Sequence, residues 1–301
     1  MMRYHHFSHH LKEVFGERVW KVPLDAGFTC PNRDGRVGTG GCIYCSEGSN
    51  YLPHPYKRLP IREQLISSIS KIRGQNNIHK FIAYFQAYSN TYCPLHTLKG
   101  LYDEALNIDG VVGLSIGTRP DCLSDETLNL IEEYGAKTYL WLEIGLQSIH
   151  NRTLKLINRG HTFEQFLDAV KRAKGRGFSI CIHVILGFPG ETPADMMETA
   201  KVVRGLGIQG IKFHQLQVLR GTPLEELYFD GKIKTLDEYE YVNLVCDFLE
   251  FLPYDIIIQR LVGDAPMKKL IAPLWSLKKT DILMAIDGAM ERRGSYQGVR
   301  S

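Results

Sequence analysis

The amino-acid sequence predicts an α/β protein built as a partial (β/α)6 TIM-like barrel with a short C-terminal α/β extension. Three observations lead to this fold class. Short apolar runs alternate with segments that carry helix N-cap signals, and most runs start roughly 30 to 40 residues apart, the length of one strand with its crossover helix. The runs are almost continuously apolar, as in parallel strands covered on both faces. An open doubly wound sheet is the competing prediction, because periodicity alone does not separate the two.

The apolar runs are the expected strands of the barrel. They cover residues 22–28, 79–86, 111–116, 138–146, 178–186 and 211–219. The barrel would span residues 20–254, after a helical lead-in over 1–19. Residues 255–301 would form a basic extension, in which 255–266 are a candidate for one further strand. The chain of 301 residues suits one large domain or two small ones.

Helix starts between these runs support the alternation. Each has a side chain that can accept a hydrogen bond from the first helical turn. The predicted N-cap signals are Ser124 before 125–134, Thr162 with Gln165, Thr192 with Pro193 and Asp195, and Thr235 with Glu238.

The composition is that of a globular chain, with 44% hydrophobic residues, 23% charged residues and a formal net charge of +3. No run approaches the roughly 20 apolar residues of a membrane helix. The N-terminus lacks the apolar segment and cleavage site of an export signal. We therefore expect a cytoplasmic protein with no membrane association.

Charge is distributed unevenly near the C-terminus. Residues 222–264 carry ten acidic and three basic side chains, whereas residues 268–301 carry seven basic and three acidic ones. The basic segment would suit a polyanion such as RNA, and a solvated basic helix is the alternative.

Three of the seven cysteines lie close together, directly after the first expected strand, with the spacing Cys30-x11-Cys42-x2-Cys45. Thiolates suit iron–sulfur clusters and zinc, and the glycines between them allow the loop to wrap a bulky group. Three ligands leave one metal position open, which favours a 4Fe-4S cluster with one free iron. A zinc site completed by a histidine such as His54 is the alternative. The other four cysteines are interpreted as small buried apolar residues.

Further motifs follow the later strands. They are IGTRPD (116–121), LEIGLQS (142–148), NRGHT (158–162), HVILGFPGET (183–192) and HQLQVLRGTPL (214–224). Together with the cysteines, they resemble the radical S-adenosylmethionine (SAM) enzymes. The long first cysteine gap departs from the commonest form of that family and is similar to the Elongator catalytic subunit. The opening PLDAGFTCPNRDGRVGTGGCIYC (23–45) narrows the resemblance to the smaller YhcC/YtqA (MnmL) type, over nearly the whole chain.

The resemblance implies one 4Fe-4S cluster held by Cys30, Cys42 and Cys45, with SAM on the remaining iron. It implies that Glu143 accepts from the ammonium or ribose of SAM and that Arg159 pairs with its carboxylate. The implied SAM pocket is formed by Tyr44, Thr118, Glu143, Gln147, Arg159, His183, Gly187 and Leu219.

Polar side chains at the ends of the expected strands suggest a substrate side of the pocket. Gln86, Arg119 and His214 are the candidate catalytic residues, with a satisfied core polar residue as the alternative for His214, and Arg119 or Arg220 is the candidate cation for a substrate carboxylate. A buried ion pair between Arg119 and Asp121 is the structural alternative. Tyr84, Tyr88 and Tyr92 could stack a flipped base or serve as core aromatics.

The implied function is modification of the tRNA wobble uridine, converting 5-carboxymethylaminomethyl(-2-thio)uridine to 5-aminomethyl(-2-thio)uridine through a 5′-deoxyadenosyl radical. Expected partners are the tRNA anticodon stem-loop, bound partly by Lys57 and Arg58, an electron donor such as flavodoxin or ferredoxin, and a tRNA methyltransferase acting next. The alternatives are a radical SAM enzyme acting on a small metabolite or another RNA position, and a non-catalytic zinc-stabilised RNA-binding protein.

Overall fold

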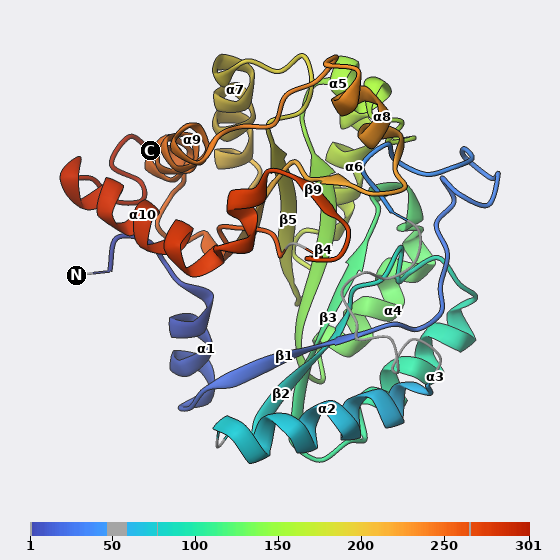
Figure 1. The fold of residues 1–301 in the computed structure, drawn as a ribbon. Coiled ribbons are helices and arrows are strands. Elements are labelled where there is room, and N and C mark those ends of the chain that lie inside the picture. Colours follow the sequence, from blue (N-terminus) through green and yellow to red (C-terminus); the bar gives the residue numbers. More distant parts are fainter. Residues whose placement is uncertain (1, 47–58, 77, 265) are drawn as a thin grey trace.

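The structure is a computed structural model, and it describes residues 2–46, 59–76, 78–264 and 266–301. Its centre is a seven-stranded, fully parallel sheet (Figure 1). The strands, in their order across the sheet, are β1 (Val19–Leu24), β2 (Lys80–Phe85), β3 (Val111–Thr118), β4 (Tyr139–Gln147), β5 (Ser179–Leu186), β6 (Gly210–Gln215) and β8 (Ile257–Arg260). A small antiparallel pair is formed by β7 (Val218–Leu219) and β9 (Leu270–Ala272).

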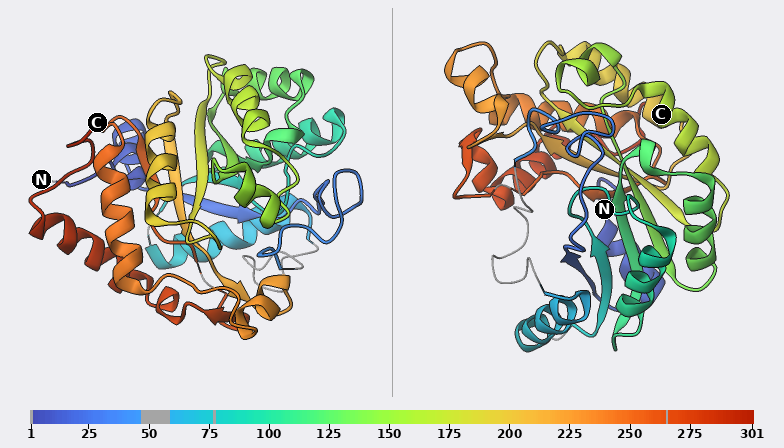
Figure 2. Two further views of the ribbon diagram at one scale, coloured as in Figure 1. Left: turned by 90° about the horizontal axis from the view of Figure 1, so that it is seen from above. Right: turned by 90° about the vertical axis from the view of Figure 1, so that its right-hand side faces the viewer.

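The sheet curls into an open half-barrel with its helices on the outside (Figure 2). The helices are α1 (Phe7–Phe15), α2 (Ile61–Asn76), α3 (Leu95–Leu106), α4 (Asp125–Gly135), α5 (Asn151–Leu156), α6 (Phe163–Ala173), α7 (Pro193–Arg204), α8 (Pro223–Phe229), α9 (Glu238–Phe251) and α10 (Lys279–Arg292), with short 3-10 turns η2 (Pro120–Cys122) and η3 (Leu274–Leu277). None of the described helices has the length and apolarity needed to cross a membrane.

The predicted fold class is confirmed, and two strands differ from the prediction. The strands follow one another across the sheet without a reversal, so a doubly wound sheet is excluded. The first strand lies at 19–24 rather than 22–28, because the residues after Leu24 leave the sheet toward the cysteines. The last run, 211–219, is split into β6 and β7, because β7 pairs with β9 instead of continuing in the main sheet. The candidate strand within 255–266 is β8, which pairs with β6.

Three of the four predicted helix starts are confirmed. Ser124 caps α4, and Thr162 and Thr192 each form a reciprocal capping box. The fourth prediction was wrong, because α9 is capped by Asp237 rather than Thr235. The Asp237 carboxylate accepts from the Glu240 amide at 2.8 Å, and the Glu240 side chain accepts from the Asp237 amide at 2.9 Å. Two overlapping boxes were available, and the carboxylate is the stronger acceptor at a positive helix end.

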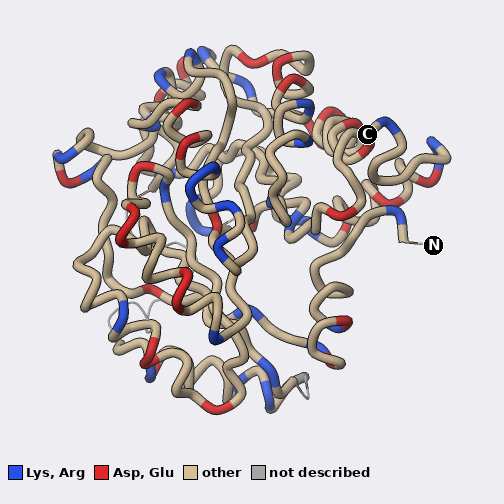
Figure 3. The backbone as a smooth tube through the Cα atoms, turned by 180° about the vertical axis from the view of Figure 1, so that it is seen from behind, with Lys and Arg blue, Asp and Glu red and all other residues tan. Residues whose placement is uncertain are grey.

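The basic C-terminal segment packs on the acidic one. Helix α10 lies against α9, and charges of both signs lie side by side near the C-terminus (Figure 3). Arg293 pairs with Asp247 at 2.7 Å, Arg300 pairs with Glu250 at 3.1 Å, and Lys279 pairs with Asp264 at 2.5 Å. The charge asymmetry in the sequence therefore holds two neighbouring parts of the chain together at these positions.

Candidate cofactor site

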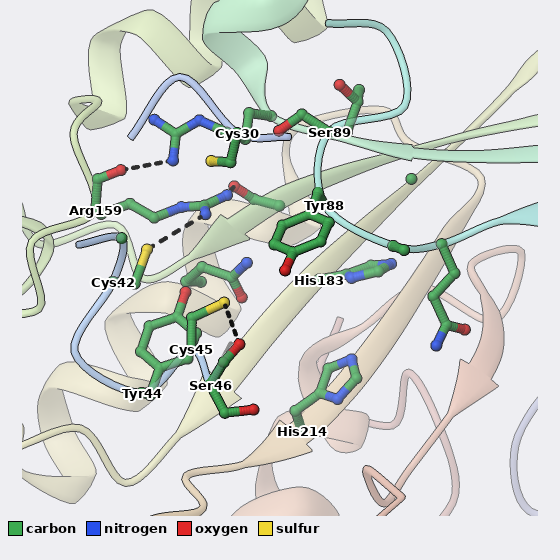
Figure 4. A pocket seen from close by; sticks show the side chains of 18 of the residues that line it. Cys30, Cys42, Tyr44, Cys45, Ser46, Tyr88, Ser89, Arg159, His183 and His214 are labelled. Atoms are coloured by element: carbon green, nitrogen blue, oxygen red, sulfur yellow. Dashed lines mark hydrogen bonds between the residues drawn. The ribbon is translucent and has the colours of Figure 1, made fainter. Parts of the chain in front are cut away.

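A cavity of about 240 Å³ lies at the carboxyl ends of the parallel strands. Cys30, Cys42 and Cys45 line it from the segment after β1, whereas His183 and His214 line it from β5 and β6 (Figure 4). The carboxyl ends of parallel strands meet at one edge of a barrel, so residues far apart in the sequence come together there. We call this cavity the cysteine pocket.

The cysteine loop, residues 30–45, is held by the segment that follows α5. Asn32 is buried, and its Nδ2 donates to the Asn158 carbonyl at 2.5 Å and lies 3.8 Å from Cys42 Sγ. The Asn158 side chain donates in return to the Gly41 carbonyl at 2.8 Å. These contacts fix the glycine-rich part of the loop against the barrel.

Arg33 fixes the other side of the loop. Its Nη2 donates to the Cys45 carbonyl at 2.6 Å, and its guanidinium lies over the Tyr88 ring, 5.7 Å from the ring centroid. The loop therefore places the positive charge of Arg33 next to the thiols, where it stabilises negatively charged groups that bind there.

Arg159 is buried beside the cysteines. Its Nη1 lies 3.8 Å from Cys42 Sγ, its Nη2 donates to the Gly145 carbonyl at 2.9 Å, and its Nε donates to His161 Nε2 at 2.8 Å. A Cβ at position 145 would lie 2.5 Å from Nη2, so a larger residue there would displace the guanidinium. Burial and the Arg159 charge lower the pKa of His161 to about 2, which keeps the imidazole neutral and able to accept. The guanidinium is thus held in one orientation next to the thiols.

Backbone strain is concentrated at the same site. In the described part of the chain, the non-glycine residues with positive φ are Tyr88 (60°), Gln147 (73°) and Asn158 (50°). Tyr88 and Gln147 line the cysteine pocket, and Asn158 braces the cysteine loop. A left-handed conformation at a residue such as Tyr or Gln costs about 1 to 3 kcal/mol and persists where the surrounding structure imposes it.

A group of buried charges lies beneath the pocket, around Glu143 of β4, which is fully buried. Its two oxygens accept from five donors, namely Lys21 Nζ and Ser115 Oγ at 2.5 Å, His183 Nε2 at 2.7 Å, Tyr84 Oη at 2.9 Å, and Lys212 Nζ. Burial opposes ionisation of Glu143, but Lys21 and Lys212 hold its pKa well below the usual range.

His183 connects this group to the cysteine pocket. Burial lowers the pKa of His183 to about 4, although the hydrogen bond to Glu143 opposes the shift. The ring is therefore neutral near pH 7, with the Nε2 proton donated to Glu143. The other ring nitrogen, Nδ1, is then an acceptor in a residue that lines the pocket.

The structure brings most of the predicted site residues together. Besides the three cysteines, the predicted residues that line the cysteine pocket are Tyr44, Gln86, Thr118, Arg119, Gln147, Arg159, His183, His214 and Leu219. Glu143 lies one layer below the lining, and its oxygens are engaged by the five donors. Contact between Glu143 and SAM stays a prediction, and the geometry favours a role in positioning His183.

Arg119 forms the ion pair with Asp121 that was the structural alternative. Two parallel hydrogen bonds join the guanidinium and the carboxylate, each 2.9 Å long, and Nη1 donates to the Arg159 carbonyl at 2.8 Å. Arg119 thus braces the loop that carries Arg159 while it lines the pocket. Arg220, the other candidate cation, is exposed and is absent from the described lining of the pocket.

Gly187 has a φ of 92°, and the Leu236 side chain fills the space that a Cβ would occupy, 2.9 Å away. This contact explains the glycine, and its predicted approach to adenine stays a prediction. His54, Lys57 and Arg58, which we considered for zinc and RNA binding, lie outside the described residues.

Sequence reasoning missed several residues of this site, among them Asn32, Lys21, Lys212 and Arg260. Asn32 stands in a loop where an asparagine usually indicates a turn. The two lysines occupy single positions within apolar strands, and Arg260 ends the short strand β8. The available signal was a lysine within an apolar strand. Because side chains alternate between the two faces of a strand, such a lysine can be assigned to the barrel interior once it is known which face points inward.

The donor set fits a multinuclear cluster. In a tetrahedral zinc site the thiolate sulfurs lie about 3.8 Å apart. In the described structure, the Sγ atoms of Cys30, Cys42 and Cys45 do not all lie within 4.8 Å of one another. Three thiols spread around one cavity suit ligation of three separate irons. The buried Oε1 of Gln147, a residue that lines the pocket, lacks a hydrogen-bond partner among the described atoms, which leaves an acceptor for a polar ligand at this site.

Comparison with known proteins assigns the family. The Radical SAM superfamily model matches residues 33–203, and the Radical_SAM C-terminal domain model matches residues 208–292. The protein YtqA of Bacillus subtilis is 45% identical over 98% of this chain and 92% of its own length. A tRNA uridine(34) acetyltransferase of Methanocaldococcus infernus is 28% identical over 61% of this chain and 34% of its own length.

Among solved structures, the archaeal Methanocaldococcus infernus Elp3 with an N-terminal deletion matches with a TM-score of 0.73. At 19% identity, the alignment covers 93% of this chain and 64% of that one, so it shows a shared fold. The half-barrel, the three thiols at its carboxyl edge and the sequence matches over nearly the whole chain agree. The chain therefore belongs to the radical SAM superfamily, whose members use a 4Fe-4S cluster and S-adenosylmethionine.

Proposed function

We propose that this protein modifies the wobble uridine of tRNA, converting 5-carboxymethylaminomethyl(-2-thio)uridine to the 5-aminomethyl form. The observation that carries the proposal is the cysteine pocket, in which three thiols, the fixed Arg159 and a group of neutral and basic side chains meet at one barrel edge. The relationship to proteins named tRNA uridine(34) acetyltransferase supports an RNA substrate. Such a reaction also needs an electron donor such as flavodoxin or ferredoxin, and a tRNA methyltransferase would take the product.

Cys30, Cys42 and Cys45 would hold the cluster, and Arg159 would bind the carboxylate of SAM. The cluster and SAM together supply a hydrogen-abstracting radical when both are bound. The remaining roles belong to the chain itself. Arg119 and His161 hold Arg159 in place, and the paired Asn32 and Asn158 hold the cysteine loop.

Aromatic and cationic side chains near the cysteine loop suit a base and its phosphates. The Arg33 and Arg36 guanidinium groups lie over the Tyr88 and Tyr92 rings, at 5.7 and 5.8 Å from the centroids. Tyr84 also lines the pocket, but its hydroxyl donates to Glu143 and the Lys21 and Lys212 ammonium groups lie over its ring, so we do not assign it to stacking. Tyr88, which lines the cysteine pocket, is the aromatic residue we assign to stacking on an extruded uracil.

The methylene between the nitrogen and the carboxylate would lose one hydrogen atom to the 5′-deoxyadenosyl radical, and then one electron to a one-electron acceptor such as the oxidised cluster, together with a proton from the nitrogen. Water would then cleave the resulting imine to the aminomethyl product and glyoxylate. Hydrolysis needs a group that accepts a proton from water. His183 presents a neutral Nδ1 acceptor in a pocket-lining ring, held by its Nε2 hydrogen bond to Glu143 at 2.7 Å. We assign this role to His183.

Nucleoside mass spectrometry of tRNA from a deletion strain tests the proposal. We expect the carboxymethylaminomethyl nucleoside to accumulate, and the wild-type gene to restore the downstream nucleosides. Cys42→Ala should fail to restore them, and the purified variant should lose iron and the absorbance near 400 nm, since each cysteine is one of three ligands. Cys93→Ala, outside the described lining of the cysteine pocket, is the matched control and should restore them. Unchanged nucleosides in the deletion strain would contradict the proposed substrate.

A further inference from the structure

A second cavity of about 710 Å³ lies at the open side of the half-barrel. Helix α1, β1 and β8 provide much of its lining, and the contact from Lys21 Nζ to Gln259 Oε1, 3.1 Å long, bridges the two edge strands. We call it the lateral cavity. Tyr84, Gln86 and Arg260 line both this cavity and the cysteine pocket, so the two spaces adjoin.

The lateral cavity has more cations than carboxylates to balance them. Lys21 and Lys212 share the single carboxylate of Glu143 at its inner end, and because burial lowers the pKa of Lys212 to about 7, Lys21 balances this carboxylate when Lys212 is neutral. Arg260 and Lys279 share the single carboxylate of Asp264 at its outer end, at 3.1 and 2.5 Å. Among the described residues that line the cavity, Asp264 is the acidic one, and Arg18 adds a further exposed cation.

Positive charge on side chains that are mostly withdrawn from solvent is costly unless an anion compensates it. The side chains of Lys21 and Lys212 are 16% and 3% exposed, and that of Arg260 is 19% exposed, so solvent screens them weakly. The charge is therefore typical of a receptor for a negatively charged ligand.

Arg260 stands at the point where the two cavities meet. It pairs in register with Lys212 on the neighbouring strand, and its charge reaches the cysteine pocket. Burial, and then the Arg260 charge, lower the pKa of His214 well below its usual range. Among the described residues, Arg260 forms an ion pair from Nη2 to Asp264. A guanidinium has five N–H donors, so this ion pair uses only part of its capacity. The side-chain amide nitrogen of Gln259, the preceding residue of β8, is buried without a partner among the described atoms.

We propose that Arg260 binds an oxyanion of the substrate at the junction of the lateral cavity and the cysteine pocket. Two oxyanions are chemically equivalent for a guanidinium, a carboxylate on the modified base and a phosphate of the RNA backbone. The inference rests on the proposed function for the identity of the substrate. The charge surplus stands independently of it.

Measuring the affinity for two anticodon stem-loop RNAs distinguishes the base carboxylate from the backbone phosphate as the oxyanion that Arg260 binds. One RNA carries the 5-carboxymethylaminomethyl group at the wobble uridine, and the other carries the 5-aminomethyl group with the same phosphates. If Arg260 binds the carboxylate, the wild-type holoprotein prefers the first RNA by about tenfold or more, and Arg260→Gln abolishes the preference. If it binds a phosphate, Arg260→Gln weakens both RNAs equally and lowers the salt slope by about one. Unchanged affinity for both RNAs overturns the proposal.

A second measurement does not depend on RNA. Inorganic phosphate and N-methylglycine, at constant ionic strength, should raise the thermal midpoint of the wild-type protein and leave that of Arg260→Gln unchanged. Equal shifts in both proteins overturn the proposal. Arg260→Lys should keep part of the shift, and Arg204→Gln, on the exposed side of α7, should behave as wild type. If neither RNA binds the wild-type protein while the anions still stabilise it through Arg260, the substrate is wrong and the oxyanion site is right.

Discussion

Glu143 is the residue around which the interior of the half-barrel is organised. Its carboxylate accepts hydrogen bonds from two lysines, a tyrosine, a serine and a histidine that come from five other strands. Breaking such a buried group by removing one charge costs about 3 to 5 kcal/mol, because the partners remain buried without compensation. The same group fixes which nitrogen of His183 carries its proton, so stability and the chemistry of the pocket are coupled at this residue.

Lys212 makes this coupling measurable through pH. Burial, and the charges of Lys21 and Arg260, lower the pKa of Lys212 from 10.5 to about 7, although Glu143 opposes the shift. Between these two values the unfolded chain binds the proton and the folded chain releases it, so stability rises as the pH increases. We expect wild type to gain about 2 kcal/mol relative to Lys212→Met between pH 7 and pH 9, measured by urea unfolding. Lys201→Met, an exposed charge removal, is the control. Parallel pH profiles for wild type and Lys212→Met would contradict it.

At the scale of elements, alternate positions of each strand serve two different environments. In β4, Leu140, Leu142 and Ile144 pack in the core under the helices, whereas Glu143 and Gln147 occupy the opposite face. The interior of a half-barrel is only partly filled by side chains, so one face of a strand can carry polar groups without breaking the apolar run. This explains how apolar strands also carry the chemical groups of the site.

The start of α9 offers two overlapping capping boxes, one beginning at Thr235 and one at Asp237, and the structure uses the second. Asp237→Ala removes the acceptor for the Glu240 amide and should lower the free energy of unfolding by about 1 kcal/mol. Thr235→Ala should change it by less than about 0.5 kcal/mol, because Thr235 lies outside the capping box. Urea unfolding midpoints measure both. A larger effect from Thr235→Ala would show that the helix is capped earlier in solution.

At the scale of the whole molecule, the two ends of the chain are joined at the last strand of the sheet. The buried Gln297 side chain donates to the Pro253 and Ile256 carbonyls at 2.7 and 2.8 Å. Its Oε1 accepts from the His5 amide at 2.9 Å, and the Ile258 amide donates to the His5 carbonyl at 2.8 Å. The N-terminal helix, the C-terminus and β8 are therefore held as one unit beside the lateral cavity.

Gln297→Ala should loosen this unit. It leaves one buried and two partly buried backbone groups without their partner, so we expect a loss of about 2 to 4 kcal/mol of stability and a lower thermal midpoint. Hydrogen exchange should increase in α1 and β8 before the other strands. Tyr296→Ala, at a neighbouring side chain that is 52% exposed, is the matched control and should remain close to wild type. Uniform exchange across all strands would show that the termini do not stabilise this edge selectively.

Much of the site could be predicted because many of its residues belong to short sequence motifs. The cysteine spacing, NRGHT and the strand-end motifs identify Cys30, Cys42, Cys45 and Arg159, and all four line one cavity. The role of Arg119 could not be predicted, because both a free guanidinium and a paired one fit the same six residues. Its pairing with Asp121 and Arg159 depends on how two loops approach each other.

The sequence by itself determined the alternation of strands and helices, three of four helix caps, the radical SAM family and the clustering of three thiols, because each depends on residues close together in the chain. Only the tertiary structure decided which cations face the interior, how they share Glu143 and Asp264, and where Arg260 stands. The physical reason is that a buried charge is defined by its neighbours across the sheet. Lys21, Lys212 and Arg260 come from three strands that no local pattern connects.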